Sequence, residues 1–332
     1  MGTSSYEKIG VIGGGAWGTA LALVAAEAGR KTLIWARESD VVEGINRDHN
    51  NARFLPGIAL PATLRATGDL AEAAKADALL LVVPAQHLRT SLQALAPLIA
   101  DGMPLVLCAK GIERGSGKLL PEVLAEAAPK AQAAILSGPS FARDVAEGLP
   151  TAITIAARPD IAQALQASLA HAQFRPYASD DVTGVALGGA AKNVYAVGCG
   201  IADGLGLGES ARAALLTRSF AELSRLGDAL GAKAETLMGL SGLGDLVLTA
   251  SSPSSRNFTF GLKLGRGTPM TELRAPGVPL AEGVETAPAL AARARRHNVE
   301  LPIADTIAAV LDGALPAGQA LERLMSRPLR PE

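Results

Sequence analysis

A cluster of glycines near the start of the chain limits the possible folds more than any other feature. The run G-G-G-A-W-G at residues 13–18 fits the pattern G-x-G-x-x-G, and it follows an apolar strand pattern at Lys8–Ile12. In this context Gly13 allows a tight turn, Gly15 lets the backbone approach a pyrophosphate, and Gly18 lets a helix pack on the strand. An Ala/Leu-rich helical pattern follows, and its N-terminus offers free N–H groups to phosphates. We therefore predict a dinucleotide site at this turn.

The first half of the chain alternates short apolar runs with helical patterns. A helical pattern extends from about Gln86 to Leu98. Further strands are predicted at Lys31–Ala36, Asp77–Val83, Leu105–Ala109 and Ala133–Leu136, and the sheet could extend through Thr151–Ala157 and Gln173–Tyr177. This alternation indicates a Rossmann-type, mostly parallel sheet covered by helices on both faces.

The pattern changes near Asp181, because no convincing strand follows it. Helical spacing dominates from Val182 to about Gly231 and returns at Ala287–Val299 and Pro302–Asp312. We predict an α/β dinucleotide-binding domain at residues 1–180 and an all-helical domain with substrate and catalytic groups at residues 181–332. The last residues, Arg327–Glu332, are expected to fray.

Composition excludes several classes of protein. The 31 Lys and Arg residues nearly balance the 32 Asp and Glu residues, so charge gives no reason to expect nucleic acid or an acidic membrane surface. Two cysteines, Cys108 and Cys199, are too few for a disulfide framework, and neither they nor the four histidines have metal-ligand spacing. With no signal-peptide pattern at the N-terminus, we expect a cytoplasmic protein that binds no metal.

One apolar stretch resembles a membrane span in length. Between Val182 and Ala202 the only charged residue is Lys192, near the middle, where insertion would cost about 3 kcal/mol. Five glycines also interrupt the stretch. We therefore predict a buried helix in a soluble protein, with no stable membrane insertion.

Lys192 is the strongest candidate for a catalytic residue. On a helix it shares one face with Gly188, Ala196 and Cys199. A lone ammonium on a face of small residues is costly to bury without a partner, although its stem could also reach water. The functional interpretation is a lysine beside a substrate carbonyl, which donates a proton in reduction and removes it in oxidation. Burial would lower its pKa toward the working range.

Three other segments carry polar groups that could meet a ligand. Lys110 follows a strand, and so do the residues S-G-P-S-F-A at 137–142, where ligands of parallel sheets bind, although a lysine at a strand end could equally be a surface residue. Asp245 ends a glycine-rich segment and could pair with the lysine or serve as a turn cap. Residues 251–257 place Arg256 among hydroxyl and amide groups, which suits either a phosphate clamp or a flexible serine-rich loop.

The end of the second strand bears on the choice between NAD and NADP. Enzymes that use NAD usually place Asp or Glu there for the ribose hydroxyls, whereas this chain has Arg37. An arginine suits a 2′-phosphate, so NADPH is favoured over NADH. The alternative is a solvated surface charge, and the neighbouring Glu38 supports it.

Taken together, these segments resemble the bacterial type of NAD(P)-dependent glycerol-3-phosphate dehydrogenase. The matching segments follow the family order across most of the chain: residues 13–19, 110–111, 137–142, 190–194, 239–245, 255–257 and 282–284. The chain departs mildly from the family at Ala16, where serine is frequent, and at Leu280, where valine is common. Backbone contacts survive the first change, but a hydroxyl contact to phosphate would be lost.

The resemblance implies a role for each matching position. Lys192 would be the proton donor and acceptor. The implied substrate contacts are Lys110, Gly138, Ser140, Lys192, Asp245, Ser255, Arg256 and Asn257. The implied cofactor contacts are Gly13, Gly15, Ala16, Trp17, Gly18, Arg37, Lys110, Ala142, Arg256, Leu280 and Glu282.

The implied reaction is the reversible reduction of dihydroxyacetone phosphate to sn-glycerol 3-phosphate, which supplies phospholipid synthesis. A related β-hydroxyacid dehydrogenase shares the domain plan and the helix-borne lysine, but its substrate carries a carboxylate. A redox sensor that binds NAD(P)H without catalysis is a third hypothesis, although it would not require Lys192, Asp245 and Arg256 to converge. The apolar helices of the second half make a homodimer a reasonable expectation.

Overall fold

The computed structural model describes residues 5–326 and residue 328, which form two compact units. Unit 1 comprises Met1–Ala109 and Leu120–Ala186, and unit 2 comprises Lys110–Leu119 and Leu187–Glu332. The chain thus enters unit 2 twice, first with a ten-residue segment that begins at Lys110. The domain boundary at residue 180 stays a prediction, and the expected fraying after Ser326 lies outside the described residues apart from Pro328.

Unit 1 is built on an eight-stranded sheet with the order β3-β2-β1-β4-β5-β6-β7-β8. Neighbouring strands are parallel except for the antiparallel pair β6 and β7, so the predicted mostly parallel sheet is confirmed. The strands are β1 Lys8–Ile12, β2 Lys31–Trp35, β3 Arg65–Thr67, β4 Ala78–Leu81, β5 Pro104–Leu107, β6 Gln132–Ser137, β7 Thr151–Ala157 and β8 Phe174–Ser179. Because β1 and β2 are parallel neighbours, the glycine turn and Arg37 both follow strands that end at one edge of the sheet.

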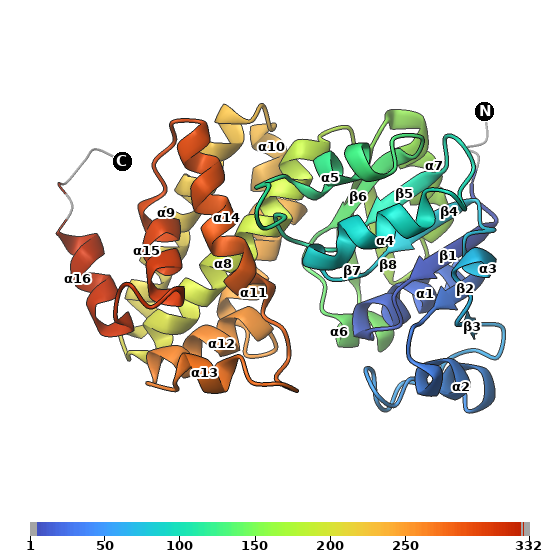
Figure 1. The fold of residues 1–332 in the computed structure, drawn as a ribbon, viewed down its shortest axis with the longest axis horizontal. Coiled ribbons are helices and arrows are strands. Elements are labelled where there is room, and N and C mark those ends of the chain that lie inside the picture. The colour runs from blue at the N-terminus through green and yellow to red at the C-terminus, as the bar shows by residue number, and fades with distance from the viewer. Residues whose placement is uncertain (1–4, 327, 329–332) are drawn as a thin grey trace. The chain divides into compact units, whose positions relative to one another are not determined.

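Helices cover this sheet within unit 1 (Figure 1). Central strands β4 and β5 are buried along their whole length, as expected for strands covered on both faces. The sequence patterns anticipated the first helix and the fourth, whereas the other five helices of this unit were not predicted. The helices are α1 Ala16–Glu27, α2 Ser39–Arg47, α3 Leu70–Ala73, α4 Leu88–Leu95, α5 Leu120–Ala127, α6 Ala142–Ala146 and α7 Pro159–Leu169, with a 3₁₀ turn at Ala85–His87.

Unit 2 is helical. Helix α8 spans Val182–Gly204 and belongs to unit 2 from Leu187 on. The side chain of Asp181 caps the start of α8 by accepting a hydrogen bond from Gly184 N at 2.7 Å. The remaining helices are α9 Gly208–Ala229, α10 Ala234–Met238, α11 Asp245–Ser251, α12 Arg256–Gly265, α13 Met270–Leu273, α14 Glu282–Arg296, α15 Pro302–Leu311 and α16 Ala320–Met325, with a π turn at Leu240–Gly244 and a 3₁₀ turn at Ala317–Gln319. Gly206, with φ of 73°, lies in the break between α8 and α9.

Glycines let α8 and α12 pack at backbone distance. A Cβ atom on Gly200 or Gly204 of α8 would overlap the backbone of α12. In return, a Cβ on Gly261 or Gly265 of α12 would overlap the backbone of α8. Each pair is four residues apart and therefore lies on one helix face. α8 is long and apolar enough to cross a membrane, but its apolar window is entirely buried in the fold, which agrees with the predicted buried helix.

A buried carboxylate joins three helices of unit 2. Glu222 on α9 accepts hydrogen bonds from Ile303 N at 2.6 Å and Ala304 N at 3.2 Å, in the first turn of α15. It also accepts one from the Tyr195 hydroxyl of α8 at 3.3 Å. Burial raises the pKa of Glu222 to about 7, although these donors oppose the shift. The N-cap residue of α15, Leu301, has no side chain that can accept a hydrogen bond, so Glu222 of α9 caps this helix instead.

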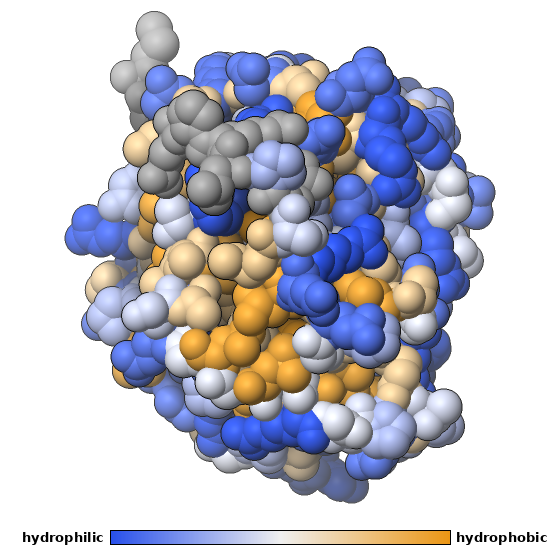
Figure 2. Space-filling view, turned by 90° about the vertical axis from the view of Figure 1, so that its left-hand side faces the viewer, coloured by the Kyte–Doolittle hydropathy of each residue, from blue (hydrophilic) through white to orange (hydrophobic). Residues whose placement is uncertain are grey.

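One face of unit 2 carries an apolar hollow. Apolar residues gather on this face in Figure 2. Residues of α8, α9, α15 and α16 line the hollow, among them Ile201, Leu215, Ile307 and Leu321. Leu321 is 41% exposed and Met325 is 75% exposed, so α16 leaves apolar surface uncovered.

Candidate active site

The glycine turn after β1 has the geometry that phosphate binding requires. Gly13 has φ of 126°, which side chains rarely adopt, and a Cβ on Gly18 would overlap the carbonyl oxygen of Gly13. Gly15 is different, because its φ is −70° and a Cβ there would meet nothing within 4 Å. The fold itself therefore does not need a glycine at position 15. The free space lies at the N-terminus of α1, where N–H groups favour anions.

Three other predicted cofactor contacts also lie in unit 1. Arg37 follows β2, and its side chain is 84% exposed and forms an ion pair with Glu38 at 3.1 Å, so only this surface pair would have to open for the guanidinium to reach a ligand. Trp17 is half-buried in the first turn of α1, and its Nε1 is buried with no hydrogen-bond partner among the described residues. Ala142 is half-buried and begins α6.

Two predicted substrate contacts form a tight bend at the end of β6. Gly138 has φ of 153°, and a Cβ there would lie 2.8 Å from the backbone of Ile153 on β7. Ser140 is half-buried and donates a hydrogen bond to Gly138 O at 3.1 Å. The bend thus needs glycine at position 138, while position 140 presents a hydroxyl.

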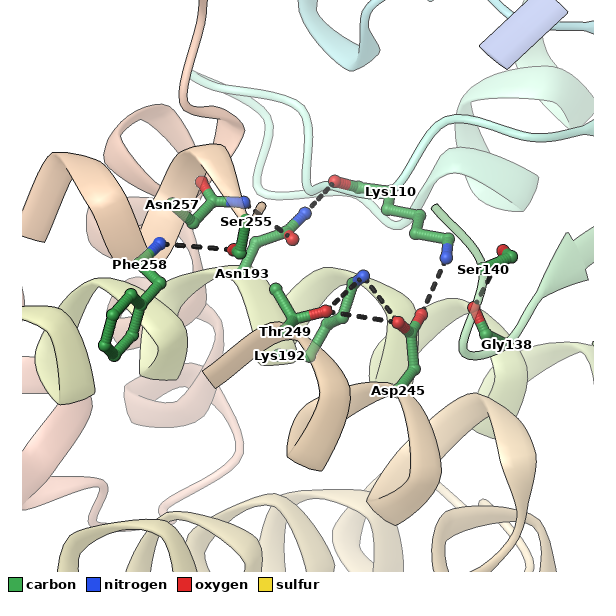
Figure 3. A network of polar contacts seen from close by, with 10 residues as sticks. All are labelled: Lys110, Gly138, Ser140, Lys192, Asn193, Asp245, Thr249, Ser255, Asn257 and Phe258. Atoms are coloured by element: carbon green, nitrogen blue, oxygen red, sulfur yellow. Dashed lines mark hydrogen bonds and ion pairs between the residues drawn. The ribbon is translucent and has the colours of Figure 1, made fainter. Parts of the chain in front are cut away.

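A charged network in the interior of unit 2 joins two of the predicted lysines to Asp245 (Figure 3). Asp245 is 0% exposed, and its two carboxylate oxygens are shared between them. Lys192 Nζ lies 2.7 Å from Oδ1, and Lys110 Nζ lies 2.6 Å from Oδ2. Thr249, one helical turn after Asp245, accepts a second hydrogen bond from Lys192 Nζ at 2.8 Å. The predicted pairing of Lys192 with Asp245 is therefore present.

The network sets the protonation of its members. Burial lowers the pKa of Lys192 to about 8, against the opposing effect of the Asp245 carboxylate and with a smaller contribution from the charge of Lys110. Burial would raise the pKa of Asp245, but the two neighbouring ammonium groups outweigh it and hold that pKa below its usual range. Asp245 is therefore an anion near neutral pH, while Lys192 exchanges its proton close to neutrality.

Lys192 retains capacity to bind one more acceptor. An ammonium group has three N–H donors. Asp245 and Thr249 take two of them, and among the described residues no third acceptor is in contact with Nζ. The side chain is nevertheless only 9% exposed. A third N–H in such a site suits an oxygen atom of a bound ligand.

Local structure explains how Asp245 reaches the lysines. The segment Leu240–Gly244 forms a π turn, which is rare and often marks functional sites. Its glycines allow close approach, because a Cβ on Gly242 would overlap the backbone of Leu237. The turn ends at Asp245, which begins α11. The glycine-rich sequence thus serves to place Asp245, and the simpler interpretation of Asp245 as a cap does not describe its contacts.

The serine-rich segment ends at the N-terminus of α12. Ser255 is the N-cap, and its Oγ accepts a hydrogen bond from Phe258 N at 3.2 Å. The first turn contains no acidic residue, and Arg256 is exposed. The N–H groups of Arg256 and Asn257 at this helix start have no carbonyl partner within the helix. Residues 255–257 therefore form a capped helix start whose N–H groups suit an anion.

The Asn257 side chain is held by bonds within unit 2. Its amide donates to Asn193 Oδ1 at 2.9 Å and accepts from Gly283 N at 2.9 Å. Asn193 in turn donates to Lys110 O at 3.0 Å. Asn257 can therefore offer its backbone N–H to a ligand, while its side chain connects α12 to α8 and to the start of α14.

Glu282 begins α14 and is half-buried, and Leu280 just before it is 45% exposed.

Comparison with known proteins agrees with this geometry. Residues 8–163 match the profile described as NAD-dependent glycerol-3-phosphate dehydrogenase N-terminus, and residues 181–322 match the corresponding C-terminus. A curated protein of Parvibaculum lavamentivorans named glycerol-3-phosphate dehydrogenase [NAD(P)+] is 57% identical over 331 residues, which is 99% of both chains. A protein of the same name from Bradyrhizobium is 56% identical over 98% of both chains. The chain belongs to the glycerol-3-phosphate dehydrogenase family.

A solved structure of the family has the same fold. The glycerol-3-phosphate dehydrogenase of Coxiella burnetii has a TM-score of 0.91 and 39% identity, and the match covers 97% of this chain and 99% of that one. The resemblance inferred from the sequence motifs is thus confirmed at the level of the family and the fold. The roles of individual residues in this family member remain predictions.

Two polar residues near Lys110, Lys192 and Asp245 were not predicted from the sequence. Thr249 could have been found, because on a helix it lies one turn from Asp245 and must face the same side. Asn193 follows Lys192 directly, but adjacent helix positions point in different directions, so the sequence does not place it near Lys110.

The two cysteines are buried, and burial raises the pKa of Cys199 to about 12, as expected for inert thiols.

The geometry at Gly15 yields a first test. We expect Gly15→Ala to leave the melting temperature nearly unchanged and to weaken NADPH binding by about 10-fold or more, because the methyl group occupies the space that a phosphate would use. Fluorescence titration with NADPH measures the affinity. Gly68→Ala is the matched control, since a Cβ there also meets nothing within 4 Å. Equal NADPH affinity in the two variants would show that no phosphate lies against Gly15.

Proposed function

We propose that this family member reduces dihydroxyacetone phosphate reversibly to sn-glycerol 3-phosphate with NAD(P)H and so supplies glycerophospholipid synthesis. The observation that carries the proposal is the buried Lys192 ammonium, held by Asp245 and Thr249 with one N–H remaining. A lysine with a pKa of about 8 can donate a proton and take it back near neutral pH. The reaction needs this property, since the substrate carbonyl becomes an alkoxide that must be protonated.

The substrate would bind to polar groups that unit 2 already holds in place. The Lys192 ammonium would donate a hydrogen bond to the carbonyl oxygen and pass on a proton as that oxygen gains charge. Asp245 fixes the ammonium in position and does not itself react. The phosphate would meet the backbone N–H groups of Arg256 and Asn257 at the start of α12, with the Arg256 side chain as counter-charge.

Unit 1 supports the cofactor part of the proposal. The space beside Gly15 and the first turn of α1 suit a pyrophosphate, and when bound the dinucleotide supplies the hydride. We assign Ala16, Trp17 and Gly18 to this seat, and Ala142, Lys110, Leu280 and Glu282 as further contacts. Arg37, exposed at the end of β2, supports a preference for NADPH over NADH.

We further propose a cytoplasmic homodimer with no stable membrane insertion and no nucleic-acid partner. Complete burial of the apolar window of α8 supports a helix that stays within the fold. The apolar hollow of unit 2 supports association with a second chain. A β-hydroxyacid dehydrogenase remains the alternative, and the N-terminus of α12 fits either a phosphate or a carboxylate. Faster turnover of 3-hydroxy acids than of glycerol 3-phosphate would favour that alternative.

Replacement of the lysine tests the proposed catalytic step. We expect Lys192→Ala to keep NADPH affinity and to lose turnover of dihydroxyacetone phosphate by about 100-fold or more, the scale of general acid catalysis. NADPH oxidation measures turnover, and Lys263→Ala is the control because Lys263 is an exposed lysine of α12. Turnover within about twofold of the unaltered protein would remove Lys192 from the mechanism.

The pH dependence tests the charge network independently. Since reduction needs protonated Lys192, kcat/KM for dihydroxyacetone phosphate should fall as the pH rises through about 8, and kcat/KM for glycerol 3-phosphate should rise there. Asp245→Asn removes a charge that raises this pKa and should move the transition to lower pH. Lys110→Met removes a charge that lowers it and should move the transition to higher pH. Shifts of the same sign in both variants would contradict the assignment to Lys192.

The cofactor preference depends on Arg37. We expect Arg37→Ala to lower the ratio of kcat/KM for NADPH to kcat/KM for NADH by about 10-fold, because a charge-assisted contact to the 2′-phosphate is lost. Arg47→Ala is the control, as Arg47 is also an exposed arginine of unit 1 paired with a neighbouring aspartate. An unchanged ratio would mean that Arg37 is a solvated surface charge.

A further inference from the structure

A buried asparagine holds the glycine turn from behind. Asn51 lies in the loop after α2 and is 1% exposed. Its amide nitrogen donates one hydrogen bond to Gly14 O at 2.8 Å and another to Thr19 Oγ1 at 2.8 Å. Its amide oxygen accepts from Phe54 N at 3.2 Å. Both N–H donors of the side chain are therefore used, one on the turn and one on α1.

The bond to Gly14 O controls which way the next peptide N–H points. A trans peptide is planar, so its C=O and N–H point in opposite directions. Because the carbonyl of Gly14 is held toward the interior by Asn51, the N–H of Gly15 must point away from the interior. Without this bond the peptide could turn over and present a carbonyl oxygen to the ligand side. A carbonyl oxygen there would repel a phosphate, whereas an N–H attracts it.

Packing shields both hydrogen bonds of the Asn51 amide nitrogen from water. Gly14 is itself buried, and a Cβ on it would lie 2.6 Å from Ala36 Cβ and 3.1 Å from Val41 Cγ1. Thr19 is 0% exposed, so the second hydrogen bond of Asn51 is also shielded from water. A buried carbonyl that loses its donor has no water to replace it, and its desolvation cost then favours a different peptide orientation.

We propose that Asn51 is a positioning residue of the dinucleotide site, which fixes the Gly14–Gly15 peptide so that its N–H meets the diphosphate of the cofactor. Asn51 acts through the backbone and does not itself touch the ligand. The inference rests on the proposed seat of the cofactor at the glycine turn. The residue that holds the turn, Asn51, thus lies in the loop after α2 and outside the G-x-G-x-x-G pattern.

Asn51→Asp is the sharpest test, because the carboxyl group has the same shape but replaces two N–H donors with no donor when ionised and a single O–H donor when protonated. We expect the NADPH dissociation constant to rise by about 10-fold or more, while KM for dihydroxyacetone phosphate at saturating NADPH stays within about twofold. Asn46→Asp is the matched control, since Asn46 makes the same kind of amide bond in unit 1, to Ala66 O at 2.8 Å. Equal NADPH affinity in the two variants overturns the proposal.

A comparison of ligands separates positioning from general damage to the fold. The affinity for 2′-phospho-ADP-ribose, which contains the diphosphate, should fall in Asn51→Asp. The affinity for 2′-AMP, which lacks the diphosphate, should stay within about twofold, because the peptide in question meets only the diphosphate. Equal losses for both ligands would mean a structural role alone and would overturn the proposal.

Thr19 provides a second pair of variants should Asn51→Asp fail to fold. Thr19→Val removes the hydroxyl that anchors the amide and should weaken NADPH binding by about threefold or more, while Thr19→Ser should retain the affinity. Equal affinities in these two would overturn the proposal. The Gly15→Ala variant distinguishes a failure of the proposed cofactor site from a failure of the proposed role of Asn51. If it binds NADPH normally, the cofactor seat is wrong, whereas if it binds weakly and Asn51→Asp binds normally, only the role of Asn51 is wrong.

Discussion

The polar site of unit 2 depends on one buried carboxylate between two ammonium groups. Asp245 is fully buried, and without Lys110 and Lys192 its charge would carry a large desolvation cost. Lys192 likewise needs the carboxylate, since burial lowers the pKa of Lys192 and the charge of Asp245 opposes that shift. The three groups form a compensated set with a net positive charge. Such a set suits an anionic substrate whose oxygen atom becomes negative during reduction.

The helix packing of unit 2 places this set beside a helix N-terminus. Close backbone contact between α8 and α12 depends on glycines of both helices. The amide chain from Gly283 through Asn257 and Asn193 then reaches the carbonyl of Lys110. The glycines of α8 thus serve packing, while its one lysine is the group that we propose as the proton donor. In unit 1 a comparable division exists, because Gly18 serves packing and Gly15 leaves space for a ligand.

Much of the fold could be predicted from local patterns. Runs of apolar residues identified β1, β2, β4, β5 and β6, because buried parallel strands need little more than burial and a turn at each end, and they indicated β7 and β8 as possible extensions of the sheet. The strand β3 and the helices α3 and α6 were missed, since three to five residues carry too little periodicity. The longer helices α2, α5 and α7 were not predicted either. The region from Val182 to Gly231 was predicted as one helical stretch, and the break at Gly206 divides it into α8 and α9.

By itself the sequence determined the glycine turn, the sheet type and the family, because these follow from spacing along the chain and from residues that occur in a fixed order. Only the tertiary structure decided which groups meet. Lys110 and Asp245 are 135 residues apart, and Asn51 and Gly14 are 37 apart. Such contacts depend on how helices and loops pack in three dimensions. Local sequence does not encode this packing, because the residue type of a donor or a charged group is the same whether its side chain faces water or a buried partner.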